Sequence, residues 1–291
     1  MTDIVLADGR TLDLRLAGPT HAPALVYIHG TPSSGAVPSD IGAAALARGM
    51  RLVSWSRAGY ATSSRRPGRS VADSVFDAAE VLDHLGIESA YAVGESGGGP
   101  HVLACAALLP QRLRAVASLA GVAPYAESQG SLDWFAGMGQ DNLDEFGASL
   151  EGEAAVRDYL EPQGAQLRTV QADGIVATMA SLLPAVDRLY LLGPFGDDLA
   201  LSFREAVSVS IDGWVDDDLA FTRPWGFDLG SIAVPATVWQ GSDDLMVPFA
   251  HGEWLAAAIP GVRARLLPGD GHLSIGVGRA AEIVDDLLAR G

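Results

Sequence analysis

A single serine stands inside a glycine-rich turn at residues 94–98, where the chain reads Gly-Glu-Ser-Gly-Gly. An apolar run precedes this turn and an apolar helical segment follows it, so the pattern predicts strand, sharp turn and helix, with Ser96 at the tip. Glycine at positions 94 and 98 relieves the crowding in such a turn. The helix beyond it directs free N–H groups and its positive dipole end back at the serine. These features suit a nucleophile whose reaction creates an oxyanion.

The same turn also fits an interpretation without nucleophilic chemistry, namely the strand-to-helix turn of a nucleotide-binding fold. With 34 glycines in the chain, the motif alone is weak. However, there is no Gly-x-Gly-x-x-Gly near the N-terminus and no lysine-bearing phosphate loop. The surrounding elements therefore have to decide between the two interpretations.

Buried strands and helices alternate on both sides of the turn. A hairpin is expected over 3–17, further strands at 24–28, 51–55, 90–94, 115–119, 235–240 and 263–267, and helices at 41–48, 71–85, 249–258 and 278–289. The strand at 24–28 is wholly apolar, and the alternation of strands with helices is typical of a parallel sheet that is covered on both faces.

The pattern changes between residues 124 and 230, where no clear strand occurs. Helices are expected there at about 142–150, 152–170, 173–183, 184–192 and 198–211. Most aromatic side chains of this segment should pack within it, and the rest, with Trp134 and Trp214 as candidate substrate contacts, should roof a cavity. The three aspartates at 216–218 are interpreted as a solvated face or a helix cap. The chain is thus divided into a core, 1–123 and 231–291, and a helical cap, 124–230.

The composition excludes several classes of partner. The net charge is −17, from 36 acidic against 19 basic residues, and every basic residue is arginine. Binding to nucleic acid or to an anionic membrane surface is therefore not expected. No apolar run approaches the ~20 residues of a membrane span, and the start of the chain lacks the features of a signal peptide. A cytoplasmic protein acting on a small molecule is expected, and a homodimer is left open.

Two further interpretations concern particular side chains. The lone cysteine, Cys105, follows Ser96 in the next helix and is expected to be a core residue. The four arginines in and after one loop are expected on a solvated rim: Arg57, Arg65, Arg66 and Arg69.

Four motifs occur in one order along the chain: His-Gly-Thr-Pro at 29–32, Gly-Glu-Ser-Gly-Gly at 94–98, Gly-x-x-Asp at 241–244, and Gly-His at 271–272. In this combination the chain resembles the α/β-hydrolase family, in particular its cap-bearing serine hydrolases of the proline iminopeptidase and esterase kind. The resemblance covers essentially the whole chain. It implies an α/β fold with a mostly parallel central sheet flanked by helices and an inserted helical cap.

The resemblance also implies Ser96 as nucleophile, His272 as base and Asp244 as the acid that orients the base. The chemistry of these residues agrees, because a serine hydroxyl needs an imidazole to take its proton, and the imidazole needs a carboxylate to fix its tautomer. Of the six histidines, His272 is the one expected on a loop beyond the final strand. The neighbouring Asp243 remains the alternative acid, although the spacing from the glycine favours Asp244.

An oxyanion needs two backbone donors, which are expected to be the N–H groups of Gly97 and of Thr31 in the loop after Gly30. Gly30 and Glu95 are candidate substrate contacts, and Glu95 is either a turn residue or an acid at the pocket floor. A serine nucleophile argues against the epoxide-hydrolase and haloalkane-dehalogenase branches, which use aspartate. Proline iminopeptidases typically read Gly-Gly-Ser-Trp-Gly in this motif, from which the present sequence with Glu95 differs, and this puts that branch in doubt.

No cofactor and no metal are implied by these residues. The expected activity is that of a cofactor-independent serine hydrolase cleaving a small or medium ester, lactone or thioester through an acyl-enzyme. Aminopeptidase, carbon–carbon bond hydrolase and perhydrolase are the enzymatic alternatives. A small-molecule receptor that retains the triad is the alternative from another class.

Overall fold

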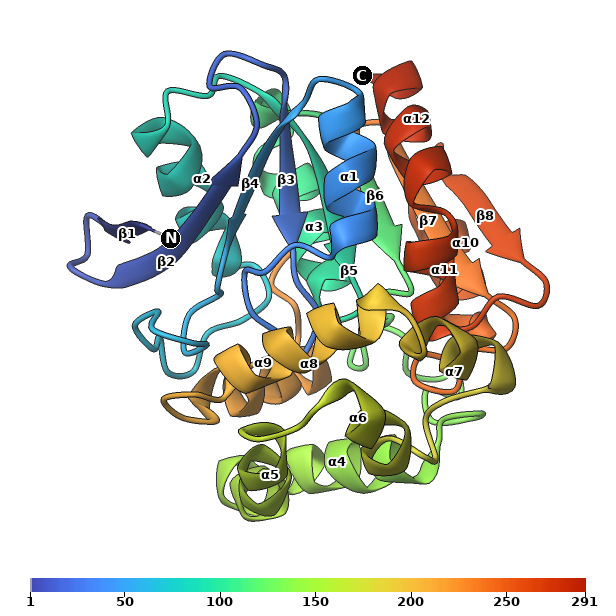
Figure 1. Ribbon diagram of the computed structural model, residues 1–291. Coiled ribbons are helices and arrows are strands. Elements are labelled where there is room, and N and C mark those ends of the chain that lie inside the picture. The colour runs from blue at the N-terminus through green and yellow to red at the C-terminus, as the bar shows by residue number, and fades with distance from the viewer. Residues whose placement is uncertain (1) are drawn as a thin grey trace.

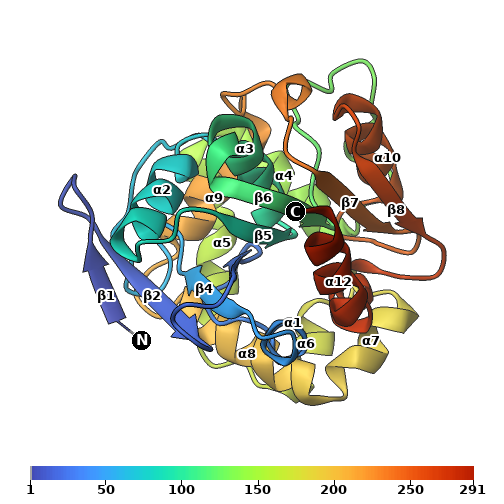
Figure 2. The ribbon, with the colours of Figure 1, turned by 90° about the horizontal axis from the view of Figure 1, so that it is seen from above.

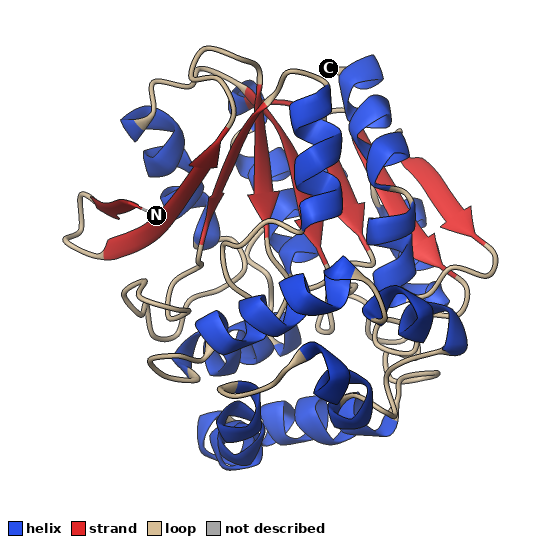
Figure 3. Ribbon diagram, in the orientation of Figure 1, coloured by secondary structure: helices blue, strands red, loops and turns tan. Residues whose placement is uncertain are grey.

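A computed structural model describes residues 2–291 and is built around one eight-stranded sheet with the order β1-β2-β4-β3-β5-β6-β7-β8 (Figures 1 and 3). The strands β1 and β2 pair antiparallel with each other, β2 pairs antiparallel with β4, and the remaining pairs are parallel. The strands are β1 Thr2–Val5, β2 Thr11–Ala17, β3 Ala24–Ile28, β4 Arg51–Trp55, β5 Ala90–Glu95, β6 Leu113–Leu119, β7 Ala236–Gly241 and β8 Arg263–Leu267. The expected hairpin and the mostly parallel sheet are both confirmed.

The central strands β3 and β5 determine where the loops of the site begin. All five residues of β3 are buried, as a strand covered on both faces requires. The two strands run parallel in a register that pairs Ile28 with Gly94. Because parallel strands end at the same edge of a sheet, the loop after Ile28 leaves the sheet beside the turn that carries Ser96.

Helices cover both faces of the sheet (Figure 2). The helices α2 (Ser74–His84), α3 (Gly98–Leu108) and α10 (Phe249–Ala258) lie on one face, and α1 (Ser39–Ala47) and α12 (Ala280–Arg290) lie side by side on the other. Short 3₁₀ turns occupy Pro110–Arg112 and Leu229–Ser231. Cys105 is buried in α3 as expected, and burial raises the pKa of its thiol to about 12. It therefore behaves as a small core residue.

Between β6 and β7 the chain forms six α-helices that lie across the carboxyl ends of the strands (Figure 1). They are α4 Gln140–Glu151, α5 Glu153–Leu167, α6 Ala172–Thr178, α7 Ala185–Leu191, α8 Pro194–Ala206 and α9 Asp212–Thr222. These helices share a hydrophobic cluster that includes Leu160, Phe203 and Val215. The helices expected in this segment are present, with shifted ends, whereas the division of the chain into a core and a cap remains a prediction.

Helix α9 is the element that the sequence did not indicate. Every residue from Gly213 to Thr222 is buried, so the helix has no polar face to produce a helical periodicity. A further short helix, α11 (His272–Gly278), begins where a loop was expected. No helix in residues 2–291 is both long enough and apolar enough to cross a membrane.

Candidate active site

Ser96 lies in the turn between β5 and α3, with a φ of +51°. A positive φ is strained for a residue with a side chain, and the surrounding contacts hold it there: the Ser96 N–H donates to Leu119 O at 2.8 Å, and the Gly99 N–H donates to Ser96 O at 2.8 Å. A side chain at Gly94 would collide with the carbonyl of Gly98. The chain therefore folds into the sharp turn predicted from the glycine spacing.

The acid comes from the loop after β7, and the base is the first residue of helix α11, which follows β8. The Nδ1 of His272 lies 2.8 Å from Oδ2 of Asp244, and both side chains are buried. Asp244 also accepts the N–H groups of Met246 and Val247, each at 2.8 Å, which fixes its carboxylate. The alternative acid, Asp243, is exposed and accepts a hydrogen bond from Ser242 instead. Asp244 is therefore the carboxylate that contacts His272.

The pKa of His272 reflects two opposed effects. Burial alone would lower it, but the charge of Asp244 and its hydrogen bond outweigh burial and raise the pKa of His272 above the ordinary value of 6.5. Because Nδ1 is bound to Asp244, Nε2 is the nitrogen left to exchange a proton, and no partner for it is found among residues 2–291.

The other buried histidines have both ring nitrogens engaged. His29 accepts the Arg57 N–H on Nε2 at 2.9 Å, and its Nδ1 lies 2.8 Å from Gly30 O. His251 accepts the Ala123 N–H on Nδ1, and its Nε2 lies 2.8 Å from Trp134 O. Burial lowers the pKa of His251, and that of His101, to about 4. These side chains are held neutral as structural groups, which leaves His272 as the candidate base.

The two expected oxyanion donors lie close together. A side chain at Gly97 would collide with Thr31, so the absence of one lets the loop after β3 pack directly on the turn. Neither the Thr31 nor the Gly97 N–H donates to a backbone carbonyl within residues 2–291. This agrees with the prediction that both serve as oxyanion donors, which stays a prediction.

Arg57 and Asp217 hold the Thr31 loop in place. The Arg57 guanidinium donates to the carbonyl of His29 and, at 3.0 Å each, to Gly30 O and Thr31 Oγ1. Asp217, from helix α9, accepts Thr31 Oγ1–H at 2.6 Å, the Tyr60 hydroxyl at 2.7 Å and Arg57 at 2.5 Å. The network thus joins the helical segment to the candidate oxyanion loop.

The Asp217 carboxylate is also bound on its other oxygen. Arg69 lies 2.6 Å and His101 Nε2 3.2 Å from Oδ1. Burial would raise the pKa of Asp217, but the two arginines outweigh it and hold the pKa well below the ordinary value of 3.8. Asp217 is therefore an ionised, buried carboxylate between two guanidinium groups.

These contacts correct two expectations. The aspartates at 216–218 do not form a solvated face, since all three are buried, and Asp216 binds Arg65. Arg57 and Arg69 do not lie on a solvated rim, because the carboxylate of Asp217 draws both inside. The sequence near a charged residue does not show whether folding will bury it against a residue of opposite charge. Arg57 and Asp217, for example, are 160 positions apart in the chain.

Asp187, in α7, supports the candidate base and was not singled out by the sequence. It is completely buried and accepts three backbone N–H groups, those of His272 at 2.8 Å, Leu273 at 3.1 Å and Ser274 at 2.8 Å. A side chain at Gly271 would collide with its carboxylate. Asp187 therefore fixes the first turn of α11, where His272 lies.

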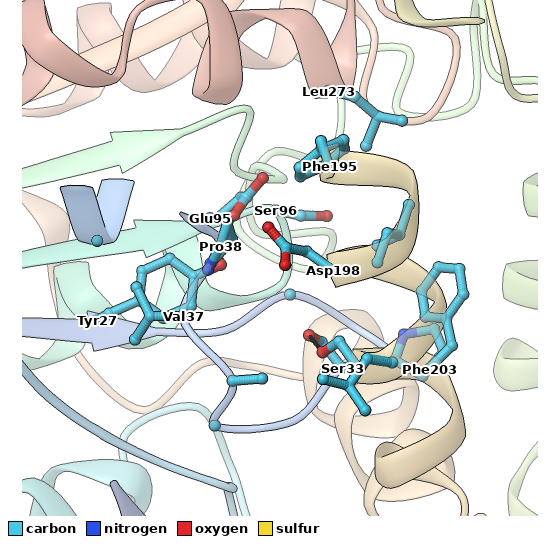
Figure 4. Close-up of a pocket in the computed structure, with 18 of the residues that line it drawn as sticks. Tyr27, Ser33, Val37, Pro38, Glu95, Ser96, Phe195, Asp198, Phe203 and Leu273 are labelled. Atoms are coloured by element: carbon cyan, nitrogen blue, oxygen red, sulfur yellow. Dashed lines mark hydrogen bonds between the residues drawn. The ribbon is translucent and has the colours of Figure 1, made fainter. Parts of the chain in front are cut away.

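Ser96 lies where two chambers meet. The α8 chamber has a volume of about 380 Å³ and is lined by Ser96, Gly30, Glu95, His272 and side chains of helix α8 (Figure 4). The α4 chamber has a volume of about 240 Å³ and lies on the Gly97 side, against helices α4, α5 and α9. Thr31 and Ser96 belong to the walls of both. A substrate could therefore place its two halves in different chambers.

Three predicted substrate contacts have different positions. Glu95 lines the α8 chamber, where it accepts the Tyr27 hydroxyl at 2.5 Å, and burial raises its pKa. It is thus the acid at the pocket floor, not a simple turn residue. Trp214 lines the α4 chamber. Trp134 lines neither chamber, because its indole donates to Ala123 O and its ring packs edge-on against Phe146 in the core.

The model of the family described as α/β hydrolase fold matches residues 23–278. The chain therefore belongs to the α/β-hydrolase family, as the four motifs predicted. Among solved structures it resembles a hydrolase from Pseudomonas aeruginosa PA01, with a TM-score of 0.71, 22% identity, and coverage of 99% of this chain and 97% of that one. These structures share the fold.

Other solved structures carry more specific names. An esterase from Rhodococcus sp. ECU1013 aligns with a TM-score of 0.65 at 22% identity, over 100% of this chain and 99% of that one. An enol-lactonase from Burkholderia xenovorans LB400 aligns with a TM-score of 0.63 at 22% identity, over 99% and 100%. At this level of identity the likeness concerns the fold alone.

Relatives were also found by sequence, among them the following two proteins. An uncharacterized hydrolase of Bacillus subtilis (strain 168) is 33% identical over 112 residues, so the match spans 38% of this chain and 38% of that protein. A putative non-heme haloperoxidase of Mycobacterium phage D29 is 27% identical over 251 residues, 86% of this chain and 81% of that protein. The relatives found by sequence thus include a hydrolase and a putative haloperoxidase.

Proposed function

We propose that this protein is a cofactor-independent serine hydrolase that cleaves a small or medium ester, lactone or thioester. The observation that carries the proposal is the buried Asp244–His272 pair. Asp244 binds Nδ1 of His272 and leaves Nε2 free, and both His272 and Ser96 line the α8 chamber. A hydroxyl, an imidazole and a carboxylate in this relation are the components of nucleophilic acyl transfer.

In the proposed reaction, Ser96 Oγ attacks the acyl carbon while His272 Nε2 takes its proton. The N–H groups of Gly97 and Thr31 stabilise the oxyanion, and the imidazolium of His272 then protonates the departing alcohol or thiol. This leaves an acyl group on Ser96. A water molecule, deprotonated by the same nitrogen, attacks that ester and releases the acid and free enzyme.

The chambers support a substrate of modest size with apolar parts. The α8 chamber presents Phe195, Leu199 and Phe203 along helix α8. An esterase and an enol-lactonase share this fold, which agrees with ester or lactone cleavage without deciding between them. Aminopeptidase and carbon–carbon bond hydrolase remain alternative activities of the same site.

The direct test is hydrolysis of an activated ester such as a 4-nitrophenyl acylate. The Ser96→Ala variant should lose on the order of 10⁶ in kcat, as is typical when a nucleophile of this kind is removed. Labelling by a phosphonofluoridate should occur on Ser96 of the wild type. If Ser96→Ala retains more than a few per cent of the rate, the assignment of the nucleophile is wrong.

The acid can be tested with its neighbour as a matched control. Asp244→Asn should cost roughly 10⁴ in rate, because the imidazole then adopts the wrong tautomer. Asp243→Asn removes an exposed carboxylate one position away and should cost less than about tenfold. A wild type that hydrolyses each activated ester only once would instead indicate a receptor, the alternative from another class.

Perhydrolysis is a second candidate activity, favoured by the haloperoxidase-like relative that matches 86% of the chain. Here hydrogen peroxide, in place of water, would attack the acyl group on Ser96 and release a peracid. The peracid would oxidise bromide in solution. Ester-dependent bromination that disappears in Ser96→Ala would support this activity, and the absence of peracid in the wild type would exclude it.

A further inference from the structure

Two carboxyl groups of the α4 chamber, those of Glu145 and Asp218, lack the arginine partners of the neighbouring Asp216 and Asp217. Asp218 is completely buried, and no N–H or hydroxyl group among residues 2–291 donates to its oxygens, which lie within hydrogen-bond reach of the Glu145 carboxyl group. Glu145 is partly exposed on the chamber wall, where its Oε1 accepts the Trp214 indole N–H at 2.7 Å. Both residues line the chamber that Ser96 and Gly97 border. The wall therefore carries two neighbouring acids, and neither forms a salt bridge with an arginine among these residues.

The contrast with the neighbouring aspartates shows how unusual this is. Asp216 is bound by Arg65, and Asp217 lies between Arg57 and Arg69. No arginine lines the α4 chamber, and the chain contains no lysine, whereas Asp141 adds a third carboxylate to the wall. Buried carboxylates without a counter-charge are costly, so a site of this kind favours a positive ligand.

Without a bound cation, the carboxyl groups of Asp218 and Glu145 favour holding a proton. Burial and the nearby charge of Glu145 raise the pKa of Asp218 well above 3.8, and burial also raises the pKa of Glu145. Like charges at close range cannot both remain ionised in a dry site. A bound cation would take the place of that proton and leave both groups charged.

Aromatic rings form much of the remaining wall. Tyr159, Trp214 and Phe221 line the chamber together with the two acids. Ring faces attract organic cations, and most strongly when water is excluded. Within residues 2–291 no group of three His, Cys, Asp or Glu side chains is arranged to hold a metal ion. The wall thus suits an alkylammonium group better than a hydrated metal ion.

We infer that the α4 chamber binds a cationic alkylammonium group of the substrate, with Glu145 and Asp218 as its anionic partners and the aromatic wall around it. This inference rests on the proposed function, because it names the substrate class of the same site. The substrate is then an ester, lactone or thioester with an amine or quaternary ammonium on the half that enters the α4 chamber.

Binding can be measured without turnover in the Ser96→Ala variant. The probes are choline and its carbon isostere, 3,3-dimethyl-1-butanol, which have the same shape and differ in charge. Calorimetry should give choline a Kd at least about tenfold lower than that of the neutral alcohol. Adding Glu145→Gln and Asp218→Asn should remove that preference, whereas Asp144→Asn, on an exposed side chain of the same helix, should keep it.

Turnover by the wild type then identifies the half of the substrate that enters the chamber. One pair of thioesters carries 4-(trimethylammonio)butyryl or its isostere 5,5-dimethylhexanoyl as the acyl group. One pair of acetate esters carries choline or 3,3-dimethylbutanol as the leaving group. In one pair, kcat/KM for the cationic member should exceed that of the neutral member about tenfold, and Glu145→Gln should remove the difference.

The outcomes separate the two proposals. Equal or better binding and turnover of the neutral members would overturn the cation site while leaving the hydrolase assignment intact. A choline preference in Ser96→Ala together with no hydrolysis by the wild type would overturn the hydrolase assignment and keep the site. If the Glu145 and Asp218 variant melts near the wild-type temperature and retains the choline preference, these two acids are not the partners.

Discussion

The contact between Asp217 and the Thr31 loop leads to a prediction that separates stability from catalysis. Asp217→Asn keeps the shape of the side chain but removes the charge between Arg57 and Arg69, both of which are buried. Removing one partner of a buried ion pair costs roughly 3–5 kcal/mol, because the remaining charge is left uncompensated. For a chain of this length we expect the Tm to fall by roughly 6–10 °C.

The same substitution should also lower kcat at temperatures where the variant is fully folded. Asp217 accepts the Thr31 hydroxyl at 2.6 Å, and the Thr31 N–H is a proposed oxyanion donor. Displacement of a positioned group by about 1 Å costs roughly 10²-fold in rate, and complete loss of one oxyanion donor costs 10²–10³-fold. We therefore expect kcat on an activated ester to fall roughly 10²-fold while KM changes little.

Two matched variants test this explanation. Asp216→Asn removes the ion pair with Arg65 from the same helix without touching the Thr31 loop, so it should lower Tm and leave kcat unchanged. Thr31→Val removes the hydroxyl but leaves every charge in place, so it should lower kcat at a cost of only about 1 kcal/mol in stability. If Asp217→Asn lowers Tm but keeps kcat within about twofold of the wild type, the network stabilises the fold without positioning the oxyanion donor.

Three further predictions concern the base and the charge of the cleft. First, kcat/KM should fall as the pH drops through the pKa of His272, because the imidazolium cannot take a proton. Because that pKa is raised, the midpoint should lie above pH 6.5, and Asp244→Asn should move the midpoint to lower pH. Second, Asp187→Ala leaves three backbone N–H groups without their acceptor. Kinetics should show kcat falling at least about tenfold, and chemical unfolding should show the free energy of unfolding falling by roughly 2 kcal/mol or more. An unchanged kcat would refute a role of Asp187 in positioning His272. Third, the negative charge of the protein should repel coenzyme A, so a coenzyme A thioester should have a lower kcat/KM than a short neutral thioester at ~20 mM salt. This difference in kcat/KM should narrow at ~200 mM salt as screening increases. A higher kcat/KM for the coenzyme A thioester would instead indicate a phosphate site.

The sequence alone predicted the framework of the site. The glycines around Ser96 allow a sharp turn, and the alternation of strands with helices permits few arrangements other than a parallel sheet with its loops at one edge. These are local constraints, read from residues that are neighbours in the chain. The family match and the described sheet confirm this part of the prediction.

The burial of charge was decided by the tertiary structure. A run of three aspartates is ordinarily solvated, and nothing near positions 216–218 reveals that arginines about 150 residues earlier in the chain will neutralise two of them. The same holds for Asp187, whose partners are backbone N–H groups 85 to 87 positions away. The same holds for Trp134, whose ring packs in the core. The sequence near an aromatic residue does not show which cavity, if any, its ring will face.

The choice between Asp243 and Asp244 shows the division most clearly. The two residues are adjacent and chemically identical, so composition and pattern treat them alike, and spacing gave only a preference. In the folded chain one carboxylate meets the ring of His272 at 2.8 Å, and the other faces solvent. Sequence periodicity determines which elements form, whereas the identity of a side chain's partners depends on how those elements pack, because contacts between distant segments exist only after folding.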